Sequence, residues 1–256
     1  MRIPIRTSRW AIWASRAARL ALPVLIFTIF LHRQELIDSA AFKVAGGLGL
    51  VLGLIALVLG LIAYSRIWIT GDRGWRPASW GVIAGLICAA PLAYGIVQML
   101  RFPDVSDVST DTVAPPAFTH PVAASDFDDP RISGVITAAF PNAAPREYPL
   151  SAQEAFLVAQ DLAERRGWEI IAASLPLANA PGMIRAVDTT LLGWRDEIVI
   201  RVAQSEEGTR IDMRSASRET GHDLGANGAR IEAFLLELDD RVTERTHEFG
   251  LVAPAN

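Results

Sequence analysis

The segment Val44–Tyr64 decides the architecture of this chain, since it reads VAGGLGLVLGLIALVLGLIAY and contains no charged residue. A helix of about twenty apolar residues is long enough to cross the hydrocarbon core of a bilayer, which is about 30 Å thick. A second uncharged stretch, Ser79–Leu100, follows after a short basic loop. Its internal Pro91 is tolerable because neighbouring helices can satisfy the carbonyl that a proline frees. The sequence therefore predicts an integral membrane protein with spans at about residues 44–69 and 79–100.

A shorter apolar segment, Leu20–Leu31, precedes these two spans. It becomes a third span, at about residues 17–36, if Arg16 and Arg19 extend their charged groups toward the membrane surface. The alternatives are an interfacial helix, a signal anchor and a cleaved signal peptide. We favour a span because no small-x-small cleavage site follows the segment and because further spans come after it. The membrane region, residues 1–100, thus holds two or three transmembrane helices.

Arginine and lysine in the short flanks set the expected orientation of the spans. The leader and the loop between the second and third spans are rich in arginine: Arg2, Arg6, Arg9, Arg16, Arg19, Arg66, Arg73 and Arg76. The loop on the other side has only Arg33 and Lys43, beside Glu35 and Asp38. We expect a multi-pass protein of the cytoplasmic (inner) membrane with a cytoplasmic N-terminus. The residues after the third span then lie on the far side, which in a Gram-negative cell is the periplasm.

Small residues recur along the second span at helical spacing, at Gly49, Gly53, Ala56 and Gly60. Such a stripe lets helix backbones approach closely. We expect it to pack against the other spans of the same chain, with dimerisation as the alternative. No charged or strongly polar side chain lies mid-span to suggest transport, so the helices read as an anchor that contacts the lipid bilayer.

The charge and cysteine content exclude several classes of function. The net charge of −4 averages a basic first hundred residues and an acidic remainder, so it predicts no binding of nucleic acid. Cys88 is the only cysteine and lies within an apolar run, which excludes an intramolecular disulfide and a thiolate-rich metal site. The four histidines are dispersed without the spacing of metal ligands. We therefore expect neither a metal nor another cofactor.

Residues 101–130 contain five prolines and six aspartates and show no helical or alternating apolar period. A segment of this composition cannot bury a core. We predict an extended linker here, which separates the membrane region from a folded domain at residues 131–250.

That domain shows the signals of an α+β fold. Ser151 and Glu154 form a capping box that begins a helix ending near Arg166, and a second helix is predicted from about Leu224 to Glu248. Between them lie four strand candidates: Trp168–Ser174, Met183–Thr189, Glu197–Gln204 and Thr209–Ser217. A further strand is expected around Gly134–Ala138. Helix, strands and helix joined by short connections predict an antiparallel sheet of about four to five strands, packed on one face by two helices.

A polar cluster lies where the last predicted strand meets the last helix. Its members carry charge, hydroxyl or amide groups: Arg214, Ser215, Ser217, Arg218, Asp223, Asn227 and Arg230, with Asp196 and Glu197 upstream. Asp223 or Asn227 can cap the helix, and Arg230 in its first turn needs a carboxylate partner such as Asp196, Glu197 or Asp223. One interpretation is a network of salt bridges and caps. The other is a site for an anion such as a phosphate, a carboxylate or a lipid headgroup.

The run R-S-A-S-R-x-x-G-x-D-L-G-x-N-x-x-R-I, residues 214–231, resembles the signature of the DUF1499 family, a domain of unknown function. The upstream stretch Leu192–Glu197 is similar to the acidic segment that precedes the hairpin in that family, with Glu197 where a second aspartate is common. The resemblance covers about residues 128–245. It implies a membrane-anchored member of the family, and it implies no catalytic residues.

An enzyme is not the favoured interpretation. Ser217, His222 and Asp223 include the residue types of a nucleophilic triad, but the sequence has no G-x-S-x-G elbow. We expect a non-catalytic binding or structural role in the cell envelope, with an anionic envelope ligand or an envelope protein as partner. An envelope hydrolase and a protein–protein scaffold are the alternatives.

Overall fold

The computed structural model describes residues 6–119, 122, 125, 127–206, 208–219 and 221–248, with the backbone alone for 246–248. Arg2 of the predicted basic leader lies outside these residues. The chain forms two compact units, Met1–Val97 and Gln98–Asn256, and each is described by itself.

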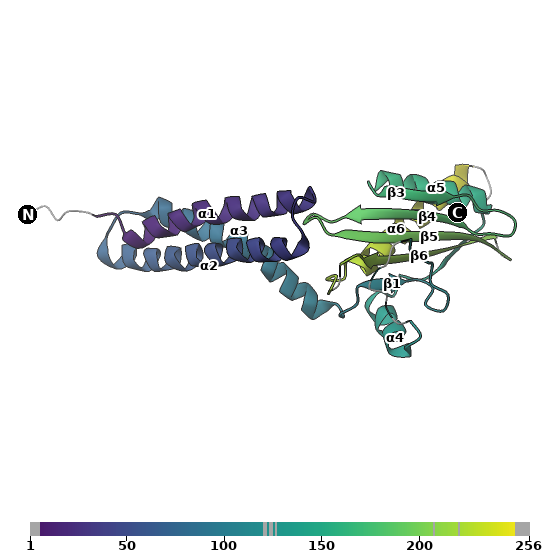
Figure 1. The fold of residues 1–256 in the computed structure, drawn as a ribbon, viewed down its shortest axis with the longest axis horizontal. Helices are drawn as coiled ribbons and strands as arrows, with labels where there is room; N and C mark the ends of the chain where they lie inside the picture. The colour runs from purple at the N-terminus through teal and green to yellow at the C-terminus, as the bar shows by residue number, and fades with distance from the viewer. Residues whose placement is uncertain are drawn as a thin grey trace, which may run out of the picture. The chain divides into compact units, whose positions relative to one another are not determined.

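The first unit is a bundle of three helices: α1 (Arg9–Arg33), α2 (Ser39–Thr70) and α3 (Trp75–Arg101, whose last turn lies in the second unit) (Figure 1). Each is long and apolar enough to cross a membrane, so the three predicted helices are present. Asp38 caps α2, because its Oδ1 accepts a hydrogen bond of 2.8 Å from the backbone N–H of Ala41. Gly71 ends α2 in the left-handed conformation, at φ 70°.

The predicted stripe of small residues along α2 is buried: Gly49, Gly53, Ala56 and Gly60. A side chain at Gly53 would collide with Cys88 of α3, and one at Gly60 would lie 2.7 Å from Val82 Cγ2. A side chain at Gly49 would lie 3.3 Å from Leu25 Cδ1 of α1. The stripe therefore packs within the chain, because only glycine and alanine allow the backbones to come this close.

The second unit is an antiparallel sheet with the strand order β1-β6-β5-β4-β3. A short sixth strand, β2, also pairs with β6, at Arg146↔Ile211, whereas β1 pairs further along β6, at Asp107↔Ala216. The strands are β1 (Asp107–Ser109), β2 (Arg146–Tyr148), β3 (Glu169–Ser174), β4 (Gly182–Thr189), β5 (Arg195–Ser205) and β6 (Gly208–Ser217). The α+β fold and its antiparallel sheet are thereby confirmed.

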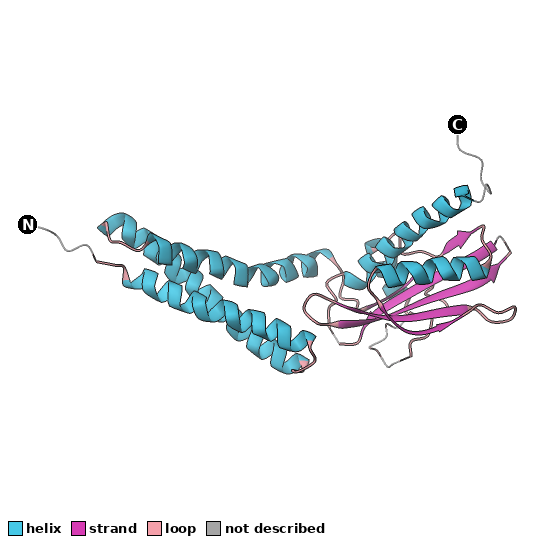
Figure 2. Ribbon diagram, turned by 90° about the horizontal axis from the view of Figure 1, so that it is seen from above, coloured by secondary structure: helices cyan, strands magenta, loops and turns pink. Residues whose placement is uncertain are grey.

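Two helices, α5 (Ala152–Arg165) and α6 (Ala226–Glu248), pack on one face of this sheet (Figure 2). The predicted capping box is present, since Ser151 Oγ accepts from the Glu154 N–H and the Glu154 side chain accepts from the Ser151 N–H. The core between the layers is fully buried and comes from both: Phe156, Leu162, Ile184, Ile198, Ile200, Met213, Phe234 and Leu238. Burial of each such side chain contributes about 1.5–3 kcal/mol.

Two predictions for residues 101–140 are wrong. The strand expected around Gly134–Ala138 is instead helix α4 (Pro130–Ala139), which Asp129 caps and Pro130 begins, and which buries Ile136. The segment predicted to be an extended linker contains β1, whose Asp107 and Val108 are fully buried. Composition misled here because the strand is only three residues long and one of the aspartates, Asp107, lies within it.

Candidate functional site

The pairing of β5 with β6 divides the predicted cluster between the two faces of the sheet. Side chains alternate along β6, so Ser215 and Ser217 lie on the same face of the sheet as Met213, which is in the core beneath the helices. Arg214 and Arg218 therefore point to the opposite face. The nine candidate residues lie on neighbouring strands and at the start of the last helix, but on two faces of the sheet. They therefore do not form one site.

On the helix-covered face the cluster is organised around Arg230 of α6, whose side chain is 8% exposed. Its Nη2 donates to Asp196 Oδ2 at 2.6 Å, and its Nε donates to Asp188 Oδ2 at 2.9 Å. Its Nη1 donates to Ser215 Oγ at 3.0 Å and to Asn227 Oδ1 at 2.6 Å. The expected partner Asp196 is thus present. The pairing with Asp188, on the neighbouring strand β4, was missed.

Asn227 and Asp223 complete this group as caps and connectors. The Asn227 side chain is fully buried and donates from Nδ2 to Ser106 O at 2.9 Å and to Ser217 Oγ at 3.1 Å. Its Oδ1 accepts from Ser215 Oγ at 2.7 Å as well as from Arg230. Asp223 accepts from the backbone N–H groups of Asn227 at 2.8 Å and Gly225 at 2.9 Å, so it caps the start of α6.

Burial raises the pKa of two aspartates in this group, Asp196 and Asp223. It raises the pKa of Asp196 above the ordinary value, and the attraction of the Arg230 guanidinium only partly offsets the effect. Burial likewise raises the pKa of Asp223, against the stabilising hydrogen bonds from the N–H groups of Asn227 and Gly225.

On the opposite face Arg214 is held by the segment that composition had assigned to a linker. Its Nε and Nη2 donate to the two carboxylate oxygens of Asp107, at 3.0 and 2.7 Å, and its Nη1 donates to Pro116 O at 3.0 Å. The guanidinium also stacks on Phe118, 4.4 Å from the ring centroid, and lies 5.1 Å from that of Phe127. Each of the three guanidinium nitrogens of Arg214 therefore donates to a partner within the chain.

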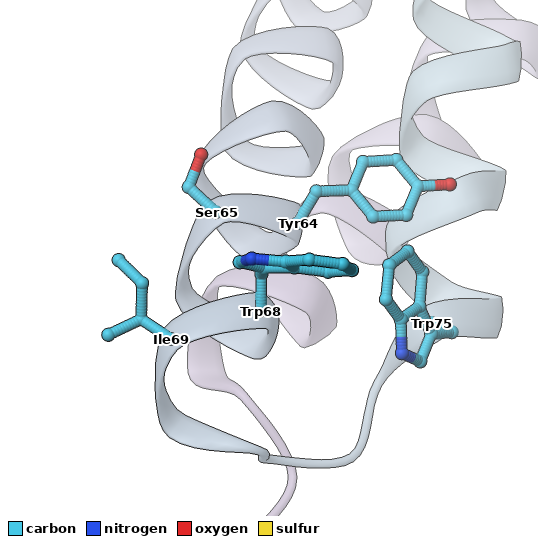
Figure 3. A pocket seen from close by; sticks show the side chains of 5 residues that line it. All are labelled: Tyr64, Ser65, Trp68, Ile69 and Trp75. Carbon is cyan, nitrogen blue, oxygen red and sulfur yellow. The ribbon is translucent and has the colours of Figure 1, made fainter.

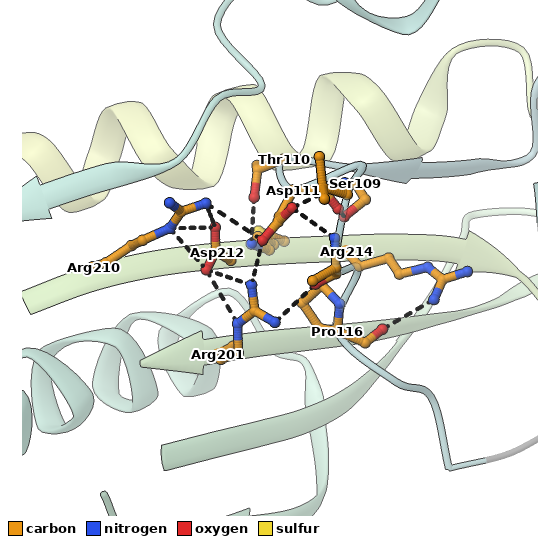
Figure 4. Close-up of polar contacts among 11 residues, drawn as sticks. Ser109, Thr110, Asp111, Pro116, Arg201, Arg210, Asp212 and Arg214 are labelled. Carbon is orange, nitrogen blue, oxygen red and sulfur yellow. Dashed lines mark hydrogen bonds and ion pairs between the residues drawn. The ribbon is translucent and has the colours of Figure 1, made fainter. Parts of the chain in front are cut away.

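A second group on this face joins two arginines to two aspartates (Figure 4). Arg201 Nη2 lies 2.7 Å from Asp111 Oδ2 and 2.7 Å from Asp212 Oδ2, and its Nη1 donates to Ala114 O at 2.8 Å. Arg210 Nη2 lies 3.0 Å from Asp212 Oδ1. Burial alone would raise the pKa of Asp111, but hydrogen bonds from backbone N–H groups and from Arg201 outweigh it and lower the value.

Arg218 pairs with Glu197, which the sequence offered as a possible partner of Arg230. Its Nη2 and Nε both donate to Glu197 Oε1, at 2.6 and 2.8 Å, and its side chain is 27% exposed. Each arginine of the predicted polar cluster, Arg214, Arg218 and Arg230, is thus bound to a carboxylate of the same domain. We name the ion pairs on both faces the arginine–carboxylate network: Arg201, Arg210, Arg214, Arg218 and Arg230 with Asp107, Asp111, Asp188, Asp196, Glu197 and Asp212.

Four carboxylates of this network were not predicted: Asp107, Asp111, Asp188 and Asp212. The signal that could have located two of them is the run Asp107-Val-Ser-Thr-Asp111, in which Val108 is apolar between polar neighbours, as at a sheet edge.

Ser217 and His222 do not form a nucleophile and base. The His222 Nδ1 accepts from the Leu224 N–H at 2.9 Å, and its Nε2 lies 3.1 Å from Phe102 O, to which it donates. Neither ring nitrogen is left to accept the hydroxyl proton of Ser217, which lies instead against Asn227. Within the described ranges no group of three His, Cys, Asp or Glu side chains is placed to hold a metal ion.

Arg185, on the central part of the sheet, does not belong to the network. Arg185 of β4 pairs across the strands with Val199, on the same face as Arg214. Its buried Nε has no hydrogen-bond partner among the residues that the structure describes.

Comparison with known proteins gives one match. The family model described as "Protein of unknown function (DUF1499)" matches residues 107–238, which begins at β1 rather than near residue 128 and so includes Asp107. No curated protein and no solved structure matches the chain.

Proposed function

Given that the chain belongs to the DUF1499 family, which is described only as of unknown function, we propose from its geometry that it is a non-catalytic, membrane-anchored protein of the cell envelope. The three apolar helices anchor it in the lipid bilayer. The folded domain has a structural or binding role at the membrane surface.

The observation that carries this proposal is the neutralisation of the candidate arginines by the domain's own carboxylates. Arg214 and Arg230 are buried and make bonds through all their guanidinium nitrogens, so an incoming anion would have to displace Asp107 or Asp196. Breaking a buried pair is costly because it leaves an uncompensated charge. The network therefore acts as a brace that fixes β1 and α6 to the sheet.

An anion site at Arg185 is the second candidate, because its buried Nε lacks a partner among the described residues. The buried Nε of Arg195 on β5 is similar in this respect, but Arg195 Nη2 is paired with Glu169 at 3.2 Å. A phosphate or carboxylate would supply it. This interpretation keeps the anion-binding role that the sequence predicts and moves it away from the network.

One titration distinguishes these two roles. The thermal unfolding of the full chain in an uncharged detergent is followed with increasing inorganic phosphate, for the wild type, Arg218→Gln and Arg185→Gln. If the network is only a brace, phosphate should not stabilise the wild type in a way that Arg218→Gln abolishes. A stabilisation lost only in Arg185→Gln supports the second candidate, and one lost in Arg218→Gln contradicts the brace. Turnover of an ester or phosphoester would contradict the non-catalytic role.

The proposed location places the domain outside the cytoplasm, because the arginine-rich flanks favour the cytoplasmic side. Single cysteine substitutions in a Cys88→Ala background test this orientation. The positions are Leu36 and Val113, which are exposed, and Asp72 in the basic loop. A membrane-impermeant maleimide should label Leu36→Cys and Val113→Cys in intact spheroplasts, and Asp72→Cys only after permeabilisation. The reverse pattern would contradict the orientation and leave the anchoring itself intact.

A further inference from the structure

A small hollow opens between α1 and α3 at the arginine-rich end of the bundle. Its volume is about 330 Å³, and it is lined by Ser15, Arg19, Arg76, Pro77 and Trp80. It belongs wholly to the first unit, so its chemistry is independent of the sheet and of the arginine–carboxylate network.

Ser15 in the lining has an unused hydroxyl. The residue is 5% exposed, and the structure gives its side chain no hydrogen bond within the described residues. Hydroxyls elsewhere in the bundle donate to the carbonyl four residues earlier: Ser65 to Leu61 at 3.3 Å and Ser79 to Trp75 at 2.8 Å. The Ser15 hydroxyl can therefore donate to an acceptor that enters the hollow.

The two arginines of the hollow have no counter-ion. In the described part of the chain neither Arg19 nor Arg76 makes an ion pair or a hydrogen bond. Arg16, one turn away on α1, lies instead over the Trp13 ring at 5.0 Å. Two guanidinium groups that share one hollow repel each other, and an anion between them would remove that repulsion.

The depth of the hollow matches the headgroup layer. Ala18, next to Arg19, packs against Ala56 and Ala84 within the spans, whereas Arg76 lies in the first turn of α3. Side chains of a helix lean toward its N-terminus, so Arg19 extends toward the same end as Arg76. Trp80 is exposed beside them, as tryptophans at a membrane interface commonly are.

A neighbouring hollow of about 530 Å³ provides a contrast (Figure 3). It is lined by Tyr64, Ser65, Trp68, Ile69 and Trp75 and contains no charged group. Its hydroxyls are satisfied, since Tyr64 Oη lies 2.7 Å from Ser79 Oγ and Ser65 donates to Leu61 O. This hollow can therefore contact an apolar group, but its lining has no charged side chain to bind an anion.

We propose that Ser15, Arg19 and Arg76 bind the phosphate of an anionic phospholipid, with Trp80 beside its glycerol region. Basic pockets between transmembrane helices recognise lipid headgroups through this chemistry. The inference goes beyond the proposed function, because it needs only that the helices lie in a membrane and not that the domain has any particular role.

The test uses the full chain in an uncharged detergent, with phosphatidylglycerol, phosphatidylcholine or inorganic phosphate added, and native mass spectrometry as the readout. The variant is Arg19→Gln with Arg76→Gln. Its matched control is Arg66→Gln with Arg73→Gln, which removes the same charge from the same end of the bundle, outside the hollow. We expect the wild type and the control to retain phosphatidylglycerol, and the variant to bind it roughly 25-fold more weakly, since each arginine contributes about fivefold.

Three results would overturn the site: retention by the variant equal to wild type, an equal loss in the control, or equal retention of phosphatidylcholine. Occupancy by inorganic phosphate with no retained lipid would assign the hollow to a soluble anion and also contradict the proposal. Protection of buried Cys88 from maleimide verifies that the bundle stays packed in each variant. Ser15→Ala, a mild change within a helix, should also weaken retention of phosphatidylglycerol.

Discussion

Arg214 and Asp107 form a bidentate ion pair across the edge of the sheet, with Nε–Oδ1 and Nη2–Oδ2 distances of 3.0 and 2.7 Å. The Asp107 side chain is fully buried, and that of Arg214 is 9% exposed. The two residues are 107 positions apart in the chain. Their pairing, together with the stacking of Arg214 on Phe118, fixes the segment after the last membrane helix against the domain that it precedes.

Asp107→Asn should lower the free energy of unfolding of the second unit by about 3–5 kcal/mol, because it leaves the buried Arg214 charge without its counter-ion. Asp161→Asn is the control, since it breaks an exposed pair with Arg165 on α5, where less than about 1 kcal/mol is expected. Denaturant unfolding of the full chain in detergent measures both. Equal effects of the two substitutions would show that the buried pair adds nothing.

Replacing both partners, as Asp107→Leu with Arg214→Met, should cost less than Asp107→Asn alone. Removal of both charges avoids an unpaired buried ion, and apolar replacements of buried pairs are commonly neutral or stabilising, by about 1–4 kcal/mol. The same unfolding assay measures the coupling. Costs that simply add would contradict a direct interaction between the two residues.

The stability advantage of the wild type over Asp223→Asn should grow as the pH falls from 7 toward 4. Burial raises the pKa of Asp223 above its ordinary value of 3.8, so the folded state binds the proton more tightly than the unfolded state does. The stabilisation from this group is thus complete below pH 3.8 and is lost as the pH rises through the folded-state pKa. Melting temperatures of both proteins across this pH range measure the difference. A stability advantage of the wild type that shrinks on acidification would contradict a raised pKa of Asp223.

Gly53→Leu should loosen the bundle, whereas Gly46→Leu should not. A side chain at Gly53 collides with Cys88, while nothing lies within 4 Å of one at Gly46. Overpacking of this kind costs about 1–3 kcal/mol. The rate at which maleimide labels Cys88 in detergent reports the opening directly. Similar rates in both variants would mean that α2 and α3 do not pack through Gly53.

The parts of the fold that local sequence encodes could be predicted. The three apolar helices follow from hydropathy, and α5 follows from the capping box at Ser151. Strands β4 to β6 follow from alternation along the chain. The start of α6 was placed two residues early, because Leu224 and Gly225 adopt left-handed conformations, with φ of 59° and 79°, before the helix begins at Ala226.

What could not be predicted depends on pairing between distant residues. β1 has three residues and is stabilised by β6, about a hundred positions later, so no local period marks it. The residue types of the candidate cluster were identified, and strand alternation predicts that Arg214 and Arg218 share one face and Ser215 and Ser217 the other. The carboxylate that each arginine meets depends on the pairing of β6 with β5 and β1. The partners Asp107 and Asp111 lay in a segment whose composition suggested disorder.

The melting temperature of Arg214→Ala in the full chain tests the central claim most directly. If the arginines form a structural brace, the loss of about 3–5 kcal/mol should lower the melting temperature of the second unit by about 10 °C. Phosphate should have no effect that depends on Arg214. An unchanged melting temperature, together with loss of a phosphate-dependent stabilisation seen in the wild type, would contradict the brace and establish a ligand site at Arg214.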